Sequence, residues 1–327
     1  MQFGAMFLAD PPVSRLVDLA RQAEAAGFDY FWLNDAATLY EEPWPIFALI
    51  GEATERIKIG PLVTNPVSRD WASLAGAIAT LNEISGGRMV LGLGRGDIAV
   101  RASGKRAASV AETGRFAQAV RDLVGGRAVE LGEAKDVRIH WSPSWDLEVW
   151  GAAYGPKASR MVGATCDGLI MQSADPELVQ WAAERVADGA REAGRDPSSL
   201  EMMVGAPAYV TNDLSVAHDN VRWFSTMVAE HVAELVRRYG DEVPPGLASL
   251  ASHRNRRESL DHAAGDDISD DLNFRNCLVG PTDAHIETLR GLEAVGVDAF
   301  TAYLSHDAAE QTMEAYGADV IPNWKSA

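Results

Sequence analysis

The sequence has only two cysteines, Cys166 and Cys277, in 327 residues. Two cysteines so far apart exclude a disulfide framework and a cysteine-rich metal cluster, and they are typical of a reducing compartment. Basic residues are also scarce, with 29 Lys and Arg against 47 Asp and Glu and a formal net charge of −18. This balance argues against binding to nucleic acid or to an anionic membrane surface, because both require a basic patch.

Long hydrophobic runs are missing as well. No window approaches the roughly 18 apolar residues that a membrane-spanning helix requires, and the N-terminal MQFGAMFLADPP lacks the basic start of a signal peptide. No His, Cys and Asp cluster has metal-ligand spacing, and no G-x-S-x-G elbow occurs. We therefore expect a cytoplasmic protein without a membrane partner, a nucleic-acid partner or a metal.

What the sequence does contain is a regular alternation of strand and helix patterns. The strand patterns are FGAMF, YFWLN, IKIGPLVTN, MVLGLG, LEVWGAA, GLIMQ, EMMVGAPAYVT and AFTAYL. Amphipathic helices are expected between them, for example from Val13 to Ala26, from Trp71 to Ile84 and from Ser215 to Tyr239. Eight strand–helix units without a linker-like stretch predict an α/β protein, a (β/α)8 TIM barrel with insertions, as a single domain over residues 1–327.

Two segments depart from the alternation. Residues 127–141 alternate apolar and polar residues on both sides of a glycine, which predicts an inserted β-hairpin. Residues 241–276, after the seventh strand, are rich in Asp, Arg, His and Ser. A long segment of this kind is either a lid over the site or disordered, and both alternatives stay open.

In a barrel of this type the active site lies at the carboxyl ends of the strands. Asn34 and Asp35 follow the second strand, with Glu42 a few residues later, and His306 follows the eighth. A helix N-cap is the plain alternative for Asp35, and a cap or a packed residue is the plain alternative for His306. Gln172, after the sixth strand, is suited to bind a planar polar ligand.

The fifth strand leads into a Gly155-Pro156 pair that opens a helix. Free N–H groups at such a helix start are suited to hold an anion, and Lys157 adds positive charge, although proline is common at this position without any ligand. At the end of the fourth strand, Gly92 to Asp97 fails the dinucleotide fingerprint G-x-G-x-x-G because Asp97 takes the place of its final glycine. The glycines there serve either a close approach to a ligand or a tight connection.

Taken together, GPLVTNPVSRDWASLAGAIATLNEISGGRMVLGLGRGD and AAYGPKA resemble the bacterial-luciferase-like superfamily. The likeness extends from AEAAGFDYFWLND to the final helix. It is strongest to the branch of coenzyme F420-dependent oxidoreductases, which includes methylenetetrahydromethanopterin reductase. The resemblance implies a luciferase-like barrel that binds a flavin or deazaflavin at its carboxyl face.

The resemblance also implies which residues contact the cofactor. Members carry a non-prolyl cis peptide at the end of the third strand, which would fall at Leu62-Val63 here. The glycines of the fourth strand would then let the backbone approach the ring, and the start of the helix after the fifth strand would hold the phosphate. The implied contacts are Leu62, Val63, Thr64, Asn65, Gly94, Arg95, Gly96, Asp97, Ala153, Tyr154, Gly155, Pro156, Lys157 and Gln172.

One position departs from the family pattern. Many members have a histidine just after the second strand that assists proton transfer, whereas this sequence reads Asn34-Asp35-Ala36-Ala37. Asp35, Glu41 or Glu42, and His306 are the candidate replacements, and a buried Asp35 would be able to act as a general acid.

The expected function is hydride transfer between coenzyme F420 and a small organic substrate. One alternative is a monooxygenase that uses reduced FMN from a separate reductase. A second is a non-catalytic barrel that binds a flavin or a metabolite. The substrate contacts are expected from the loop from Asp35 to Trp44, from Arg101, from the 241–276 segment and from His306. The resemblance also implies a homodimer or a larger homo-oligomer.

Overall fold

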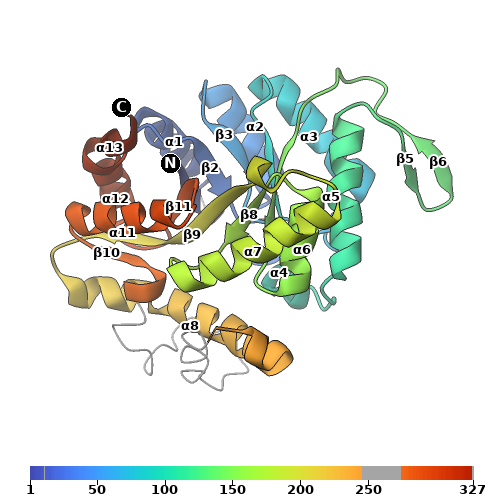
Figure 1. Ribbon diagram of the computed structural model, residues 1–327. Coiled ribbons are helices and arrows are strands. Elements are labelled where there is room, and N and C mark those ends of the chain that lie inside the picture. The colour runs from blue at the N-terminus through green and yellow to red at the C-terminus, as the bar shows by residue number, and fades with distance from the viewer. Residues whose placement is uncertain (11, 245–273, 326–327) are drawn as a thin grey trace.

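Eight parallel strands form a barrel with helices around it (Figure 1). The computed structural model describes residues 1–10, 12–244 and 274–325. The barrel strands are β1 (Gln2–Phe7), β2 (Tyr30–Leu33), β3 (Lys58–Pro61), β4 (Val90–Leu93), β7 (Glu148–Ala152), β8 (Gly168–Met171), β9 (Glu201–Val210) and β11 (Ala299–Tyr303). Their order is β3-β2-β1-β11-β9-β8-β7-β4. Two parallel bridges, Ile59 to Met89 and Thr64 to Leu93, join β3 to β4 and close the ring. The predicted (β/α)8 barrel is confirmed.

The helices follow the strands as the alternation predicts. They are α1 (Val13–Ala25), α2 (Pro43–Ala53), α3 (Trp71–Ser85), α4 (Ile98–Ala102), α5 (Val110–Val124), α6 (Pro156–Thr165), α7 (Pro176–Glu192), α8 (Leu214–Tyr239), α11 (Thr282–Ala294), α12 (Ala309–Ala315) and α13 (Pro322–Lys325), with short turns η1 (Pro197–Ser199), η2 (Gly240–Glu242) and η3 (Tyr316–Val320). Local chemistry sets several of their ends. The Asp70 carboxylate accepts the Ser73 N–H at the start of α3, and Gly86 ends that helix in the left-handed conformation. Among the described residues, none of these helices combines the length and the apolar character needed to cross a bilayer.

The barrel interior is packed with aromatic side chains. Tyr30 and Trp32, two residues apart on β2, stack with ring centroids 5.3 Å apart, and Trp150 of β7 meets Tyr30 edge-on at 6.4 Å. Because side chains of a strand alternate between its two faces, the inward series continues to Asn34 after β2 and to Tyr154 after β7. The packed centre therefore separates an upper mouth, at the carboxyl ends of the strands, from a lower floor.

The seam between β3 and β4 requires glycine for reasons of backbone packing. A Cβ atom on Gly92 would overlap the Pro61 carbonyl oxygen, and one on Gly60 would overlap the Val90 carbonyl oxygen. A Cβ on Gly94 would lie 3.1 Å from Val63, and Gly96 has a φ of +84°. Strand packing alone therefore requires glycine at Gly92, and the expectation that the glycine run also serves a ligand stays a prediction.

The two predicted insertions have different outcomes. The hairpin is confirmed as β5 (Val129–Leu131) paired with β6 (Ala134–Val137), and it projects away from the barrel (Figure 1). Most of the 241–276 segment, with its predicted lid, lies outside the described residues.

The sequence analysis missed one strand–helix unit. β10 (Leu278–Gly280) pairs with β9, and α11 follows it. Three residues make a weak strand pattern, although the amphipathic run from Thr282 that ends before Gly296 was a readable helix signal.

Candidate active site at the barrel mouth

An ion-pair cluster occupies the mouth beside β2 and β3. Asp35 is almost fully buried and accepts a hydrogen bond from the Thr64 hydroxyl at 2.6 Å. The Arg69 guanidinium donates to Asp35 through Nε at 3.0 Å and also through a terminal nitrogen. That same terminal nitrogen donates to both Glu42 oxygens, at 2.7 and 3.0 Å. Arg69 therefore ties together two of the three predicted catalytic residues.

These contacts define what the cluster can do. Burial by itself lowers the pKa of Arg69, but the hydrogen bonds and charges of Asp35 and Glu42 outweigh it and raise the pKa. Glu42 also caps α2 by accepting the Trp44 N–H, and the guanidinium lies 5.7 Å from the Trp44 ring centroid. The geometry suits Asp35 to orienting Thr64 and Arg69 at the end of β3. Its role as a general acid stays a prediction.

The end of β3 carries the expected backbone feature. The Leu62-Val63 peptide bond is cis. Thr64 and Asn65 after it are buried, and the Asn65 side-chain oxygen accepts the N–H groups of Val67 at 3.0 Å and of Ser68 at 2.9 Å. This Asx turn directs the chain out of the mouth toward α3.

The β4 end continues directly into α4. The Arg95 side chain donates to the Ala108 carbonyl at 2.7 Å, so it holds the connecting loop. Asp97 is about half exposed and pairs with Arg101 at 2.9 Å. The loop from Gly94 to Asp97 thus borders the mouth. Its one carboxylate, Asp97, is paired with Arg101 one helical turn later.

A hydrogen-bonded chain crosses the mouth between β7, β8 and β11. The Tyr154 hydroxyl donates to the Gln172 carbonyl at 2.7 Å, and the Gln172 side-chain nitrogen donates to the Tyr303 hydroxyl at 3.0 Å. Burial raises the pKa of both phenols, so both stay protonated at neutral pH. Beside them Gly155 caps α6, Pro156 is its first residue, and the side chain of Lys157 is exposed.

His306 is held on the β9 side of the mouth. Its Nε2 donates to the Ala208 carbonyl at 2.8 Å, and its ring packs on Tyr209 with centroids 4.5 Å apart. Burial lowers its pKa, and its Nδ1 is buried without a hydrogen-bond partner in the described part of the chain. Its catalytic role stays a prediction.

Three mouth residues were missed by the sequence analysis. Arg69 stands in the quoted Asn-Pro-Val-Ser-Arg stretch, where an arginine just before a helix was a usable signal. Tyr303 ends β11 on the inward face. His231 comes from α8, and its ring stacks on Tyr154 with centroids 4.3 Å apart. Nothing local in the sequence connects α8 with Tyr154.

The mouth offers unused donors that suit a polar ligand. Asn34 uses its side-chain oxygen to accept the Ala9 N–H at 2.7 Å, while its amide nitrogen is buried without a partner in the described chain. The Trp44 indole nitrogen is likewise buried and without a partner there. Buried unpaired donors cost about 1–3 kcal/mol each, so a ligand with acceptor oxygens compensates them. A flavin or deazaflavin ring with carbonyl oxygens, and a phosphate at the start of α6, fit these residues.

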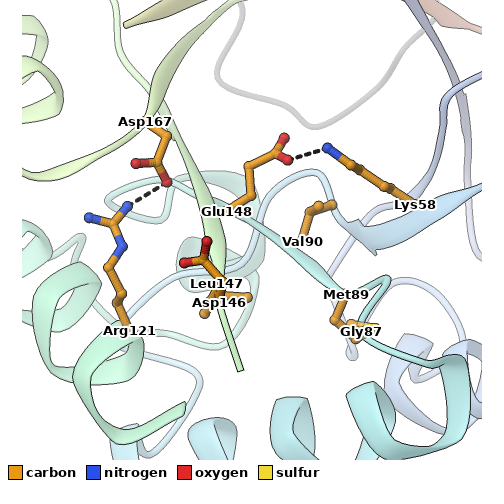
Figure 2. A pocket seen from close by; sticks show the side chains of 9 residues that line it. All are labelled: Lys58, Gly87, Met89, Val90, Arg121, Asp146, Leu147, Glu148 and Asp167. Carbon is orange, nitrogen blue, oxygen red and sulfur yellow. Dashed lines mark hydrogen bonds and ion pairs between the residues drawn. The ribbon is translucent and has the colours of Figure 1, made fainter. Parts of the chain in front are cut away.

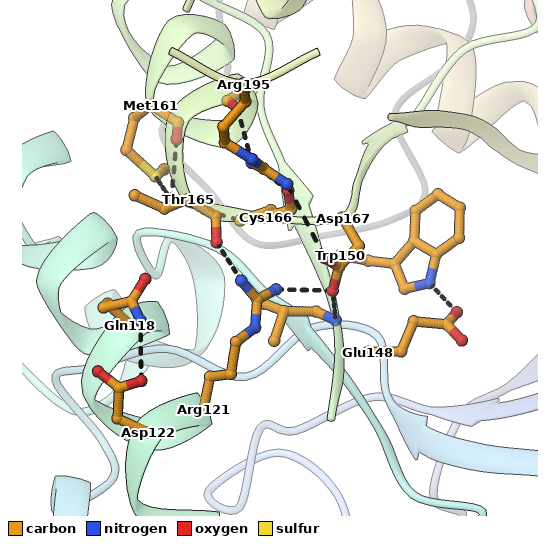
Figure 3. A network of polar contacts seen from close by, with 12 residues as sticks. Gln118, Arg121, Asp122, Glu148, Trp150, Met161, Thr165, Cys166, Asp167 and Arg195 are labelled. Atoms are coloured by element: carbon orange, nitrogen blue, oxygen red, sulfur yellow. Dashed lines mark hydrogen bonds and ion pairs between the residues drawn. The ribbon is translucent and has the colours of Figure 1, made fainter. Parts of the chain in front are cut away.

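A cavity of about 450 Å³ lies at the opposite end of the barrel, among the first residues of the strands (Figure 2). Glu148 pairs there with Lys58 and accepts the Tyr30 hydroxyl at 2.8 Å. Asp167 accepts from Arg121 at 2.6 Å and from the Val149 N–H at 2.8 Å (Figure 3). These charges are compensated within the floor, and residues at this end of such barrels serve stability. We therefore place the candidate active site at the mouth.

Metal ligands are not gathered at the mouth or elsewhere in the described ranges, where no group of three His, Cys, Asp or Glu side chains is placed to hold an ion. The chemistry of the mouth is that of hydrogen-bond donors, paired charges and aromatic rings.

The family model of luciferase-like monooxygenases matches residues 1–299. The chain belongs to this family. A 5,10-methylenetetrahydromethanopterin reductase of Methanolobus tindarius is 31% identical over 226 residues, which are 66% of this chain and 68% of that protein. An F420-dependent hydroxymycolic acid dehydrogenase of Mycobacterium tuberculosis is 30% identical over 226 residues, 64% of this chain and 62% of the relative. The solved coenzyme F420-dependent tetrahydromethanopterin reductase of Methanopyrus kandleri has the same fold, with a TM-score of 0.77, 21% identity and 99% of each chain covered.

Proposed function

We propose that this luciferase-like protein is an oxidoreductase that transfers hydride between coenzyme F420 and a small organic substrate. The observation that carries the proposal is the pair of buried donors on Asn34 and Trp44, which have no partner in the described part of the chain, at the mouth of a barrel whose relatives include F420-dependent enzymes. A bound deazaflavin supplies the carbon that gives or takes the hydride.

The residues of the chain would bind and orient the cofactor. The start of α6, from Gly155 to Lys157, offers free N–H groups and one positive charge to the phosphate. Leu62 and Val63 form the wall at the end of β3, and Thr64 is fixed beside them by Asp35. Because the centre of the barrel is filled by aromatic side chains, the ring has to lie above them in the mouth.

The alternative is a monooxygenase that binds reduced FMN supplied by a separate reductase. The description of the family itself favours it. A barrel that binds a flavin or metabolite without turnover is the second alternative. We propose a cytoplasmic homodimer as the working form of the enzyme, with a small molecule as its substrate.

The deciding experiment is a fluorescence titration of the purified protein with oxidised F420, FMN and reduced FMN in parallel. We expect binding of F420 and much weaker binding of both FMN forms. Binding of reduced FMN alone would contradict the hydride-transfer proposal and favour the monooxygenase. If none of the three binds, the result contradicts both the hydride-transfer proposal and the monooxygenase alternative.

The phosphate contact is tested separately with Lys157→Ala. We expect about a fivefold increase in the Kd for F420 and a weaker salt dependence, because one exposed charge at a helix start contributes up to about 1 kcal/mol. Lys135→Ala, in the exposed β5–β6 hairpin, is the matched control and is expected to leave the Kd unchanged. Equal Kd values for both variants would remove Lys157 from the cofactor site.

A further inference from the structure

One face of α8 lies against the mouth of the barrel. Phe224 meets the Tyr303 ring edge-on, with centroids 5.6 Å apart. His231, two turns later, stacks on Tyr154, and Leu235 approaches Gly155. The spacing of seven and then four residues puts these three side chains on one helical stripe. The stripe is apolar apart from His231. Because His231 contacts Tyr154, its imidazole lies at the β7 side of the mouth.

His231 differs from His285 and His306, which are hydrogen-bonded within the protein core. His285 is bonded to the Tyr316 hydroxyl and His306 to the Ala208 carbonyl. Neither ring nitrogen of His231 has a hydrogen-bond partner among the described residues, although its ring is fixed by stacking at an interplanar angle of 21°. His285 and His306 are each anchored by one ring nitrogen, whereas both nitrogens of His231 are without a partner in the described part of the chain.

Charged groups from α4 and its N-cap act on this imidazole. Burial lowers the pKa of His231, the Asp97 carboxylate opposes that effect, and Arg101 adds to it. Tyr154 from the β7 end and Tyr303 behind it are protonated and carry no charge. On α8 itself, the neighbouring Glu234 is paired with Arg237 and Arg238. His231 is therefore a neutral base at pH 7, with one carboxylate near enough to stabilise its protonated form.

We propose that His231 exchanges with the substrate the proton that accompanies hydride transfer. The inference rests on the proposed function. If a carbon that bears a hydroxyl gave up a hydride, which carries the C–H electron pair, to a bound deazaflavin, a C=O bond would form and the O–H proton would have to leave. The lone pair of neutral His231 accepts that proton and later passes it to solvent. In the reductive direction protonated His231 returns the proton to the oxygen.

The first test is NMR of protein labelled with ¹³C in its seven histidines, with His231→Gln to assign the resonance. In the free protein we expect the pKa of His231 to lie below 6.5. Arg101→Gln should raise this pKa and Asp97→Asn should lower it, because the two charges act in opposite directions. Addition of oxidised F420 should shift the His231 resonance. If F420 binds, as judged by fluorescence, and the resonance does not move, the proposal is overturned while the proposed function stands.

The second test measures reduction of F420 by a panel of secondary alcohols. We expect His231→Gln to lower kcat by about 100-fold or more, to leave the Kd of F420 within twofold, and to remove the acidic limb of the kcat/KM profile. His140→Gln, on the exposed segment after the hairpin, is the matched control. His231→Asn serves if the glutamine variant does not fold. An unchanged pH profile, or loss of F420 affinity alone, would show that His231 has only a structural role. Absence of F420 binding by the wild-type protein would instead overturn the proposed function.

Discussion

At the scale of single residues, the mouth is built from charges that satisfy one another. Asp35 has a side chain that is only 1% exposed, and Arg69 is its counter-charge. The second carboxylate, Glu42, shares the same guanidinium. A buried carboxylate is tolerated only while its partner is present, because an unpaired charge in the interior is expensive. The sequence indicated the two acids, and the structure adds the arginine that joins them.

Arg69→Met tests this pairing. The variant leaves Asp35 buried without a counter-charge, so we expect the free energy of unfolding at pH 7 to fall by about 3 kcal/mol in urea denaturation. The double variant with Asp35→Asn should recover part of that loss, since the neutral amide no longer needs the charge. Arg138→Met breaks an exposed pair with Asp136 and should change the stability by less than about 0.5 kcal/mol. Equal losses for the two arginine variants would contradict the assignment.

At the scale of the elements, the seam between β3 and β4 closes the barrel. The Thr64 N–H donates to the Gly92 carbonyl, and the Gly94 N–H donates to the Thr64 carbonyl, both at 2.9 Å. These bonds place Thr64 and the β4 loop side by side at the mouth. The seam is narrow because Gly60 and Gly92 have no side chains. The same glycines that close the barrel therefore position the site.

Gly92→Ala is the variant that tests the seam. Its methyl group would overlap the Pro61 carbonyl oxygen, so we expect a loss of about 3 kcal/mol in the free energy of unfolding. Gly76→Ala is the control, because a Cβ there meets no atom within 4 Å and the residue lies inside helix α3. It should stabilise the protein by about 0.5–1 kcal/mol. A Gly92 variant as stable as the wild type would show that the strands can move apart and that close packing is not the reason for glycine.

At the scale of the whole molecule, buried histidines link stability to pH. His285 on α11 is 1% exposed, its Nδ1 is 2.9 Å from the Tyr316 hydroxyl, and burial lowers its pKa to about 4. The unfolded chain binds a proton on this side chain near pH 6.5, whereas the folded protein does not until near pH 4. The stabilising contribution is therefore complete above pH 6.5 and is lost as the pH falls from 6.5 to 4.

His285→Gln measures that contribution. For the wild type we expect a loss of about 2 kcal/mol from this group between pH 7.5 and pH 5, since the unfolded state is increasingly favoured by protonation. The variant should be less stable at pH 7.5 but should lose less stability on acidification. Denaturant unfolding at both pH values gives the two differences. If the variant and the wild type lose the same amount, His285 is not the linked group.

Local patterns in the sequence determined the fold class and indicated several residues of the candidate site. Short apolar runs that alternate with amphipathic helices indicate the eight barrel strands. The strand ends then indicate Asp35, Thr64, Asp97 and Gln172 as residues of one face, because that face collects the carboxyl ends of all parallel strands. The short strand β10 was not predicted, because three residues are too few to show a clear strand pattern.

Only the tertiary structure decided which side chains meet. Arg69 reaches Asp35 across 34 residues, and α8 brings His231 to Tyr154 across a still longer separation. A pattern in one sequence shows which face of a helix is apolar, but not which element that face packs against. That contact forms only once the barrel has closed. It brings the imidazole of His231 to the mouth, although no histidine follows the second strand.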